Sequence, residues 1–132
     1  MEKNIEIIKG LYDAFSKDDV PAVLGGFDPQ IQWKEAESFL YADRNPYLGP
    51  QAVAEGVFQR IVSDVEAFTV TPEQYVEGSE HVIVEGRYRG TVKATGKPVN
   101  AQFAHLWQLR DGKIVRFQQY TDTKQWADAN GS

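Results

Sequence analysis

An Asp-Gly pair between two β-rich runs is the feature of this sequence that most restricts its fold. The runs are Phe103–Leu109 and Ile114–Asp122, and Asp111 and Gly112 lie between them. Asp-Gly strongly favours a two-residue hairpin turn with positive φ at both positions. Arg110 then faces Lys113, and every later pair of opposing residues follows from that register. The sequence therefore predicts an antiparallel hairpin with two distinct faces.

One face of this hairpin combines aromatic side chains with two groups that can move protons. In the predicted register, His105 lies opposite Gln118 and Asp122 lies opposite Ala101. An offset of four residues corresponds to about 13 Å along a flat strand, so we expect His105 and Asp122 to face a ligand from two points rather than bond to each other. The alternative is a half-buried strand pair with a hydrogen-bonded histidine and an aspartate at the strand end. The complete face is Phe103, His105, Trp107, Leu109, Ile114, Arg116, Gln118, Tyr120 and Asp122.

The remaining pattern predicts helices first and strands afterwards. Apolar residues recur at helical spacing over residues 4–17, and Asp19 and Pro21 suit the start of a short second helix that ends at Gly25-Gly26. A third helix is expected to begin near Pro50, after a strand at residues 31–35. Further strands are expected over 68–76, 82–92 and 101–109. This order is typical of an α+β fold with helices on one side of an antiparallel sheet.

Composition excludes several classes of function. A chain of 132 residues fits one domain, residues 1–132. A net charge of −5 disfavours a nucleic-acid partner, and the absence of cysteine excludes disulfides and thiolate chemistry. No apolar run approaches the roughly 18 residues of a membrane helix, and the N-terminal segment does not look like a signal peptide. We therefore expect a cytoplasmic protein without a membrane partner.

The segment Ala36–Leu48 has no sustained period but contains three aromatic residues, Phe39, Tyr41 and Tyr47. Disordered segments are poor in aromatics, and long loops in small domains are often functional. The loop is predicted to be either a lid over a pocket or part of an interface.

The order of elements resembles the SnoaL-like group of the ketosteroid isomerase-related, nuclear transport factor 2-like superfamily. The resemblance runs from about Ile5 to Trp126 and is most specific in Glu35–Tyr41 and in the Phe103–Asp122 hairpin, with its closing Tyr-Thr-Asp. It implies a cone-shaped, strongly curved antiparallel sheet packed against three N-terminal helices, a cystatin-like α+β barrel with an apolar cavity. It identifies the fold better than the reaction, because one fold hosts many functions.

The resemblance also implies which residues meet the ligand and which surface meets a partner. The cavity is expected to bind a small hydrophobic molecule without a cofactor. The opposite hairpin face carries Ala104, Leu106, Val115 and Phe117, and it is expected to form a homodimer through the outer sheet surface. The residues expected to contact the ligand are Tyr12, Phe15, Trp33, Glu35, Phe58, Phe103, Trp107, Gln118 and Tyr120.

In SnoaL-like cyclases the aspartate near the end of the last strand removes a proton α to a carbonyl, and Asp122 matches that position. Desolvation in an apolar cavity would raise the pKa of such a carboxyl and make it a better base. His105 matches a pocket histidine of the group and could donate to the developing enolate oxygen. These matches predict an isomerase or cyclase. The alternative is a binding or accessory protein that uses the same pocket without turnover.

Two related chemistries fit the residues less well. The acid–base pattern of ketosteroid isomerase places Glu35 at the base but leaves Leu11 and Ala104 at the donor positions. Only His81 and His105 could supply imidazole to a metal, and they lack a clustered set of carboxylates. The sequence predicts no metal site.

Overall fold

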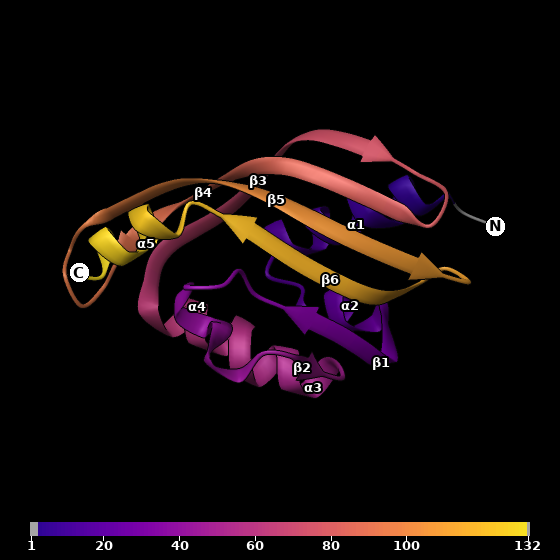
Figure 1. Cartoon of the computed structure of the whole chain (residues 1–132), viewed down its shortest axis with the longest axis horizontal. Coiled ribbons are helices and arrows are strands. Elements are labelled where there is room, and N and C mark those ends of the chain that lie inside the picture. Colours follow the sequence, from indigo (N-terminus) through magenta and orange to yellow (C-terminus); the bar gives the residue numbers. More distant parts are fainter. Residues whose placement is uncertain (1–2, 132) are drawn as a thin grey trace.

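Six β-strands form one curved sheet that is not closed into a barrel. The structure is a computed structural model that describes residues 3–131. The strands are β1 (Phe27–Lys34), β2 (Tyr47–Leu48), β3 (Val65–Glu77), β4 (His81–Val92), β5 (Pro98–Arg110) and β6 (Lys113–Thr121). Their order in the sheet is β2-β1-β6-β5-β4-β3, so β2 and β3 lie at the two edges (Figure 1).

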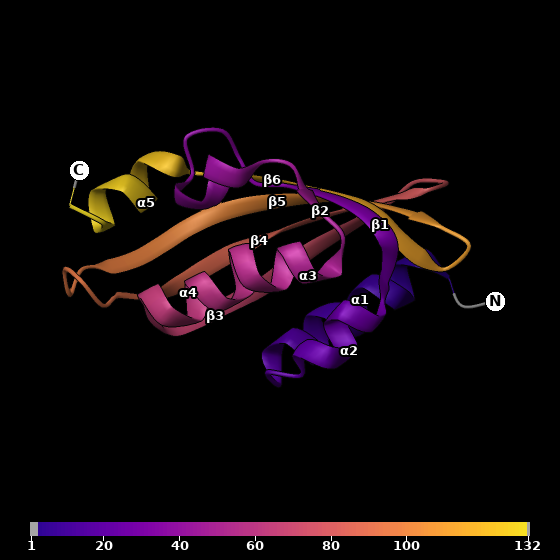
Figure 2. The ribbon, with the colours of Figure 1, turned by 90° about the horizontal axis from the view of Figure 1, so that it is seen from below.

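Most of the helices cover one face of this sheet, and the C-terminal helix lies at one end of the sheet. They are α1 (Asn4–Ser16), α2 (Val20–Gly25), the 3-10 turn η1 (Leu40–Arg44), α3 (Pro50–Val53), the π-helical turn η2 (Ala54–Phe58), α4 (Gln59–Asp64) and α5 (Thr123–Ala129). Figure 2 shows α1, α2, α3 and α4 on the same side of the sheet. The α+β class and the three N-terminal helical segments are confirmed, whereas α5 was not predicted. No helix within residues 3–131 is long and apolar enough to cross a membrane.

The apolar stripe of α1 and the cap of α2 form as the sequence predicts. Ile8, Leu11 and Tyr12 form the buried stripe of α1. The Asp19 side chain accepts a hydrogen bond from the backbone N–H of Ala22 at 3.2 Å and so caps α2. The buried apolar residues of these helices therefore face the sheet, and Tyr12 is one of the buried residues of α1.

The sheet is mixed rather than purely antiparallel. Strand β1 runs antiparallel to β2 but parallel to β6, with Trp33 beside Phe117. A parallel pair requires a long connection between its strands, and most of the chain lies between β1 and β6. This pair differs from the antiparallel expectation, and it places β1 between the edge strand β2 and β6.

A bulge in β6 changes the predicted hairpin register. Asp111 and Gly112 have φ values of 51° and 77°, which confirms the turn, and Leu109 pairs with Ile114 as expected. The next pair, however, is Gln108 with Arg116, so one residue of β6 is extra. Because side chains alternate along a strand, a shift of one residue exchanges the two faces beyond the bulge.

The bulge therefore reverses the predicted environment of every later β6 side chain. His105 pairs with Gln119 rather than with Gln118. Phe117 and Gln119 are buried, whereas Tyr120 is 55% exposed. Phe117, expected on the outer surface, instead stacks on Trp33 with ring centroids 3.7 Å apart.

Gly56, in the π-helical turn η2, packs closely against the ring of Tyr47. A Cβ on Gly56 would lie 2.2 Å from Cε1 of the buried Tyr47 ring, whereas a Cβ on Gly10 in α1 would meet nothing within 4 Å. Gly56→Ala should lower the free energy of unfolding by about 1–3 kcal/mol through overpacking. Gly10→Ala should raise it by about 0.5–1 kcal/mol because glycine is unfavourable inside a helix. Urea denaturation of both variants measures this, and equal effects would contradict the packing described here.

Candidate functional site

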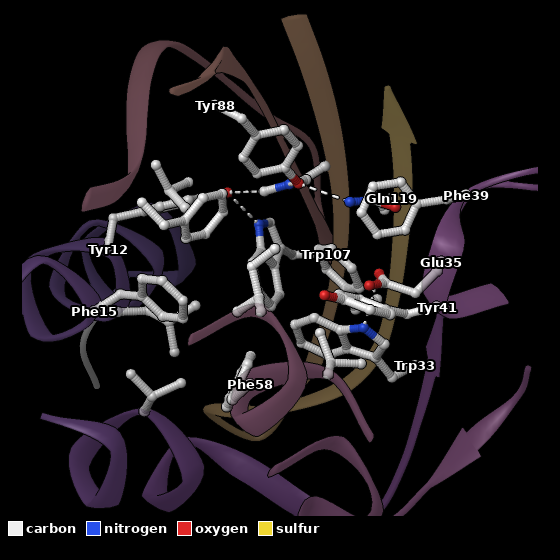
Figure 3. Close-up of a pocket in the computed structure, with 18 of the residues that line it drawn as sticks. Tyr12, Phe15, Trp33, Glu35, Phe39, Tyr41, Phe58, Tyr88, Trp107 and Gln119 are labelled. Carbon is white, nitrogen blue, oxygen red and sulfur yellow. Dashed lines mark hydrogen bonds between the residues drawn. The ribbon is translucent and has the colours of Figure 1, made fainter. Parts of the chain in front are cut away.

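An apolar hollow lies between the sheet and the helices. It contains about 620 Å³ of empty space, including the part that opens to solvent. Its lining is dominated by aromatic side chains, and the lining residues include no lysine or arginine. The lining consists of Leu11, Tyr12, Phe15, Val23, Trp33, Glu35, Phe39, Tyr41, Val57, Phe58, Ile61, Phe68, Val70, Tyr88, His105, Trp107, Phe117, Gln119 and Trp126 (Figure 3).

Most of the residues expected at the ligand lie in this lining. They come from separate elements: α1, β1 with its end, η2 and β5. The lining residues that the sequence predicted are Tyr12, Phe15, Trp33, Glu35, Phe58, His105 and Trp107. Phe103 is an exception, because it is buried behind the lining, where its ring stacks on His105 at 4.0 Å and packs on Tyr88 at 4.6 Å. Phe103 thus supports the site from outside.

The predicted positions of Gln118 and Tyr120 are wrong. Both side chains line a second groove, formed with residues 34–37 and 45–46, rather than the hollow. The bulge in β6 is the cause, since it turns Gln119 inward in place of its two neighbours. The Gln119 amide oxygen accepts the backbone N–H of Ala36 at 3.1 Å, which holds this side chain in the lining.

The predicted position of Asp122 is also wrong. Asp122 caps α5, where its carboxylate accepts the backbone N–H of Gln125 at 3.3 Å and the side-chain amide of Gln125 at 3.0 Å. These hydrogen bonds hold the pKa of Asp122 below its ordinary value of 3.8, the opposite of a buried base. An Asp followed three residues later by Gln is a sequence signature of a helix start, and that signal could have predicted α5.

Glu35 is the carboxyl group that lies in the hollow. It follows β1 directly and is 3% exposed. The indole N–H of Trp33 donates to its Oε2 at 3.1 Å, and Asn45 bonds to both its backbone N–H and its carbonyl. Burial raises the pKa of Glu35 from 4.5 to about 8, an effect that the Trp33 hydrogen bond and the Arg60 charge only partly offset.

His105 is buried between two tyrosines. Its Nδ1 lies 2.6 Å from the Tyr12 hydroxyl and its Nε2 lies 2.5 Å from the Tyr88 hydroxyl. Burial lowers the pKa of His105 from 6.5 to about 3, so the imidazole is neutral at physiological pH. Both ring nitrogens are occupied by tyrosines, which makes His105 an organiser of these hydroxyls rather than a direct acid.

The loop 36–48 forms a wall of the hollow. Phe39 and Tyr41 line it, and η1 is fixed to α4 by paired hydrogen bonds from Arg60 to Asp43 at 3.0 and 3.1 Å. The Arg60 guanidinium also lies 4.4 Å from the Tyr41 ring centroid, and the Tyr41 hydroxyl donates to Asp64 at 2.6 Å. These contacts hold the aromatic wall over the hollow.

Sequence reasoning missed several lining residues for identifiable reasons. Tyr88 lies on the inward face of β4, a position that the alternation of Val82, Val84 and Tyr88 could have shown. Trp126 comes from the unpredicted helix α5 and closes the hollow against Phe39, with ring centroids 5.1 Å apart. Within residues 3–131, no three potential metal-ligating side chains gather in one place.

An open curved sheet whose helices enclose an apolar hollow defines a class of small pocket-bearing α+β domains. The chain belongs to the SnoaL-like domain family, whose model matches residues 8–117. A search of curated proteins found no match.

Solved structures agree with this family. An NTF2-like protein from Burkholderia thailandensis is 31% identical, with a TM-score of 0.95 and 100% of each chain covered. TerC, co-crystallised with polyporic acid, is 25% identical, with a TM-score of 0.86 and 98% of each chain covered. An NTF2-like protein from Burkholderia xenovorans is 26% identical, with a TM-score of 0.81 and coverage of 96% of this chain and 94% of the other.

The capping role of Asp122 yields a direct test. Asp122→Ala removes the side-chain acceptor at the start of α5 and should lower the free energy of unfolding by about 1 kcal/mol. It should leave the affinity of the hollow for an apolar fluorescent probe unchanged, because Asp122 is outside the lining. Chemical denaturation and probe titration measure the two effects. Loss of probe affinity without loss of stability would contradict the capping role and would show that Asp122 contacts the ligand.

Proposed function

We propose that this protein is a cofactor-independent isomerase or cyclase that transfers a proton α to the carbonyl of a small hydrophobic or aromatic metabolite. The observation that carries this proposal is that, among residues 3–131, one carboxyl group, Glu35, lines the aromatic hollow. Asp122, the base expected from the sequence, is replaced in this role by Glu35.

The environment of Glu35 suits it to proton transfer. General acid–base catalysis is most effective when the pKa of the group is near the working pH, and burial raises the pKa of Glu35 to about 8. The ionised carboxylate would accept a proton from the α-carbon, while the C–H electron pair becomes the enolate double bond and the carbonyl electrons move to oxygen. The hydrogen bond from Trp33 keeps one carboxyl oxygen in place and leaves the other for the substrate.

The fate of the enolate decides between the two reactions. Return of the proton to a different carbon isomerises the substrate. Attack of the enolate carbon on an electrophilic carbon of the same molecule closes a ring. Either reaction requires a rigid apolar surface that fixes the substrate conformation. The Trp33 ring makes T-shaped contacts with the rings of Phe58 and Trp107, with centroids 5.6 and 5.8 Å apart, and the three rings supply such a surface.

The comparisons support a small-molecule role. TerC was co-crystallised with polyporic acid, and its likeness to this chain supports an organic ligand here too. The lining formed by the described residues includes no lysine or arginine, which disfavours an anionic ligand, because a buried negative charge needs a positive partner.

The alternative function is ligand binding without turnover. One observation favours it: a pKa of about 8 leaves Glu35 protonated in most molecules at neutral pH, where it can donate a hydrogen bond to a bound ligand. The two functions differ in whether hydrogen at the α-carbon exchanges with solvent.

A second copy of the chain is the partner we propose, bound through the outer sheet face. Ile83 and Tyr120 on this face are 40% and 55% exposed, and Ala104 and Leu106 lie between them on β5. Phe117 is not part of this surface, since it is buried inside. A contiguous apolar strip with a polar border is suited to self-association.

Solvent exchange into an enolisable ketone tests the proposed reaction. In D2O the protein should accelerate deuterium incorporation at the α-carbons of β-tetralone, measured by proton NMR. Glu35→Gln should reduce this rate at least about a hundredfold while β-tetralone still binds. In the native protein the rate should rise about tenfold per pH unit and level off above about pH 8, because only the ionised form of a base is active.

Asp122→Asn is the matched control, since it also removes one carboxyl group but outside the hollow. Its exchange rate should equal that of the native protein. Exchange that survives Glu35→Gln and is lost in Asp122→Asn would contradict the assignment. Binding of β-tetralone with no exchange at any pH would establish the binding alternative.

A further inference from the structure

Four hydrogen bonds join Trp107, Tyr12, His105, Tyr88 and Gln119, in that order, into one buried hydrogen-bond chain. The Trp107 indole N–H donates to the Tyr12 hydroxyl at 2.9 Å, and the Gln119 amide N–H donates to the Tyr88 hydroxyl at 2.9 Å (Figure 3). The two hydroxyls contact the two ring nitrogens of His105 at 2.6 and 2.5 Å. The Gln119 amide is fixed in this orientation because its oxygen accepts the backbone N–H of Ala36.

One donor hydrogen of this hydrogen-bond chain has no acceptor within the chain. A neutral imidazole donates from one nitrogen and accepts at the other. The tyrosine beside the accepting nitrogen donates its hydroxyl hydrogen bond to His105. The other tyrosine accepts hydrogen bonds from the imidazole N–H and from the N–H of Trp107 or Gln119. Its own hydroxyl hydrogen therefore has no acceptor within the hydrogen-bond chain.

The result holds for every state of His105. In one tautomer Tyr88 keeps the surplus proton, and in the other tautomer Tyr12 keeps it. A doubly protonated ring would leave both hydroxyl protons free. Within residues 3–131, neither hydroxyl has a further hydrogen-bond partner, and both residues are about 95% buried and line the hollow.

A second unpaired donor lies in the same lining. The indole N–H of Trp126 is buried and has no hydrogen-bond partner among the described residues. The Trp126 ring packs edge-on against Tyr88, with centroids 5.7 Å apart. Buried donors without partners are rare and costly, so two of them in one hollow indicate that the ligand supplies the missing acceptor.

We propose that the hollow recognises aromatic carbonyl compounds without a negative charge, through a carbonyl oxygen that accepts a hydrogen bond from the surplus hydroxyl of the Tyr12–His105–Tyr88 hydrogen-bond chain. The tautomer of His105 selects which tyrosine donates, so the donor can follow the carbonyl between two positions. The Trp126 N–H offers a second contact to a ligand with a further acceptor oxygen. This proposal deepens the proposed function and rests on it for the choice of a carbonyl substrate.

Infrared spectroscopy of a bound ketone tests the donor directly. The probe is β-tetralone labelled with a heavy isotope at the carbonyl carbon, and tetralin, with the same rings and no oxygen, is its control. The native protein should bind the ketone about tenfold more tightly than tetralin, the effect of one net hydrogen bond. The carbonyl band of the bound ketone should lie at lower frequency than in hexane.

Variants then identify the donor. The double variant Tyr12→Phe/Tyr88→Phe should lose the frequency shift, whereas each single variant should keep it, because the remaining tyrosine can still donate. Glu35→Leu should also keep the shift, so a failure of α-carbon exchange with the shift retained would remove the proposed reaction and leave this inference standing.

Several outcomes would overturn the inference. They are an unshifted carbonyl band in the native protein, equal affinities for ketone and tetralin, a shift that survives the double variant, and a shift lost only in Glu35→Leu or Trp126→Phe. If the double variant does not fold, NMR of native protein labelled at the hydroxyl-bearing ring carbon of tyrosine decides. The signal of Tyr12 or Tyr88 should move with β-tetralone and not with tetralin, and movement of neither would contradict the proposal.

Discussion

The burial of the Glu35 carboxyl in an apolar hollow is the constraint on which this account depends. The pKa of Glu35 rises from 4.5 to about 8, so the folded chain keeps a proton that the unfolded chain releases across this interval. Stability must therefore fall as pH rises through that window, by at most about 5 kcal/mol at roughly 1.4 kcal/mol per pKa unit. His105 acts in the opposite direction: the folded chain keeps it neutral down to about pH 3, so stability falls as pH drops below 6.5. Both shifted pKa values lower the stability of the protein over part of the pH range, and both groups line one pocket. Such clustering of perturbed pKa values is typical of functional sites.

The bulge in β6 determines which groups share that pocket. Without it, Gln118, Tyr120 and Asp122 would face inward; with it, Phe117 packs on Trp33 and Gln119 connects Ala36 to Tyr88. The single extra residue thus assembles the polar side of the hollow. It also turns Tyr120 outward to the surface proposed for self-association.

Much of the fold could be predicted from local signals, but a large part of the site could not. The Asp111-Gly112 turn, the Asp19 cap and the stripe of α1 are decided by a few neighbouring residues, and the structure agrees with them. The β6 bulge has no comparable local signature, because it depends on how the strand meets both β5 and β1. The same applies to Tyr88 and Trp126, whose rings lie 5.7 Å apart although 38 residues separate them in the chain. Asp122 differs from these residues, because its local signal is present: an Asp followed three residues later by Gln favours a helix cap, whereas the family resemblance implies a cavity position.

A pH titration of Glu35 by NMR tests the central claim most directly. The side-chain carboxyl carbon would be followed from about pH 4 to about pH 10, and the spectrum of Glu35→Gln identifies its signal. The account predicts a midpoint near 8. A midpoint near the ordinary value of 4.5 would show that the carboxyl is hydrated, and the proposed proton transfer would then lose its basis.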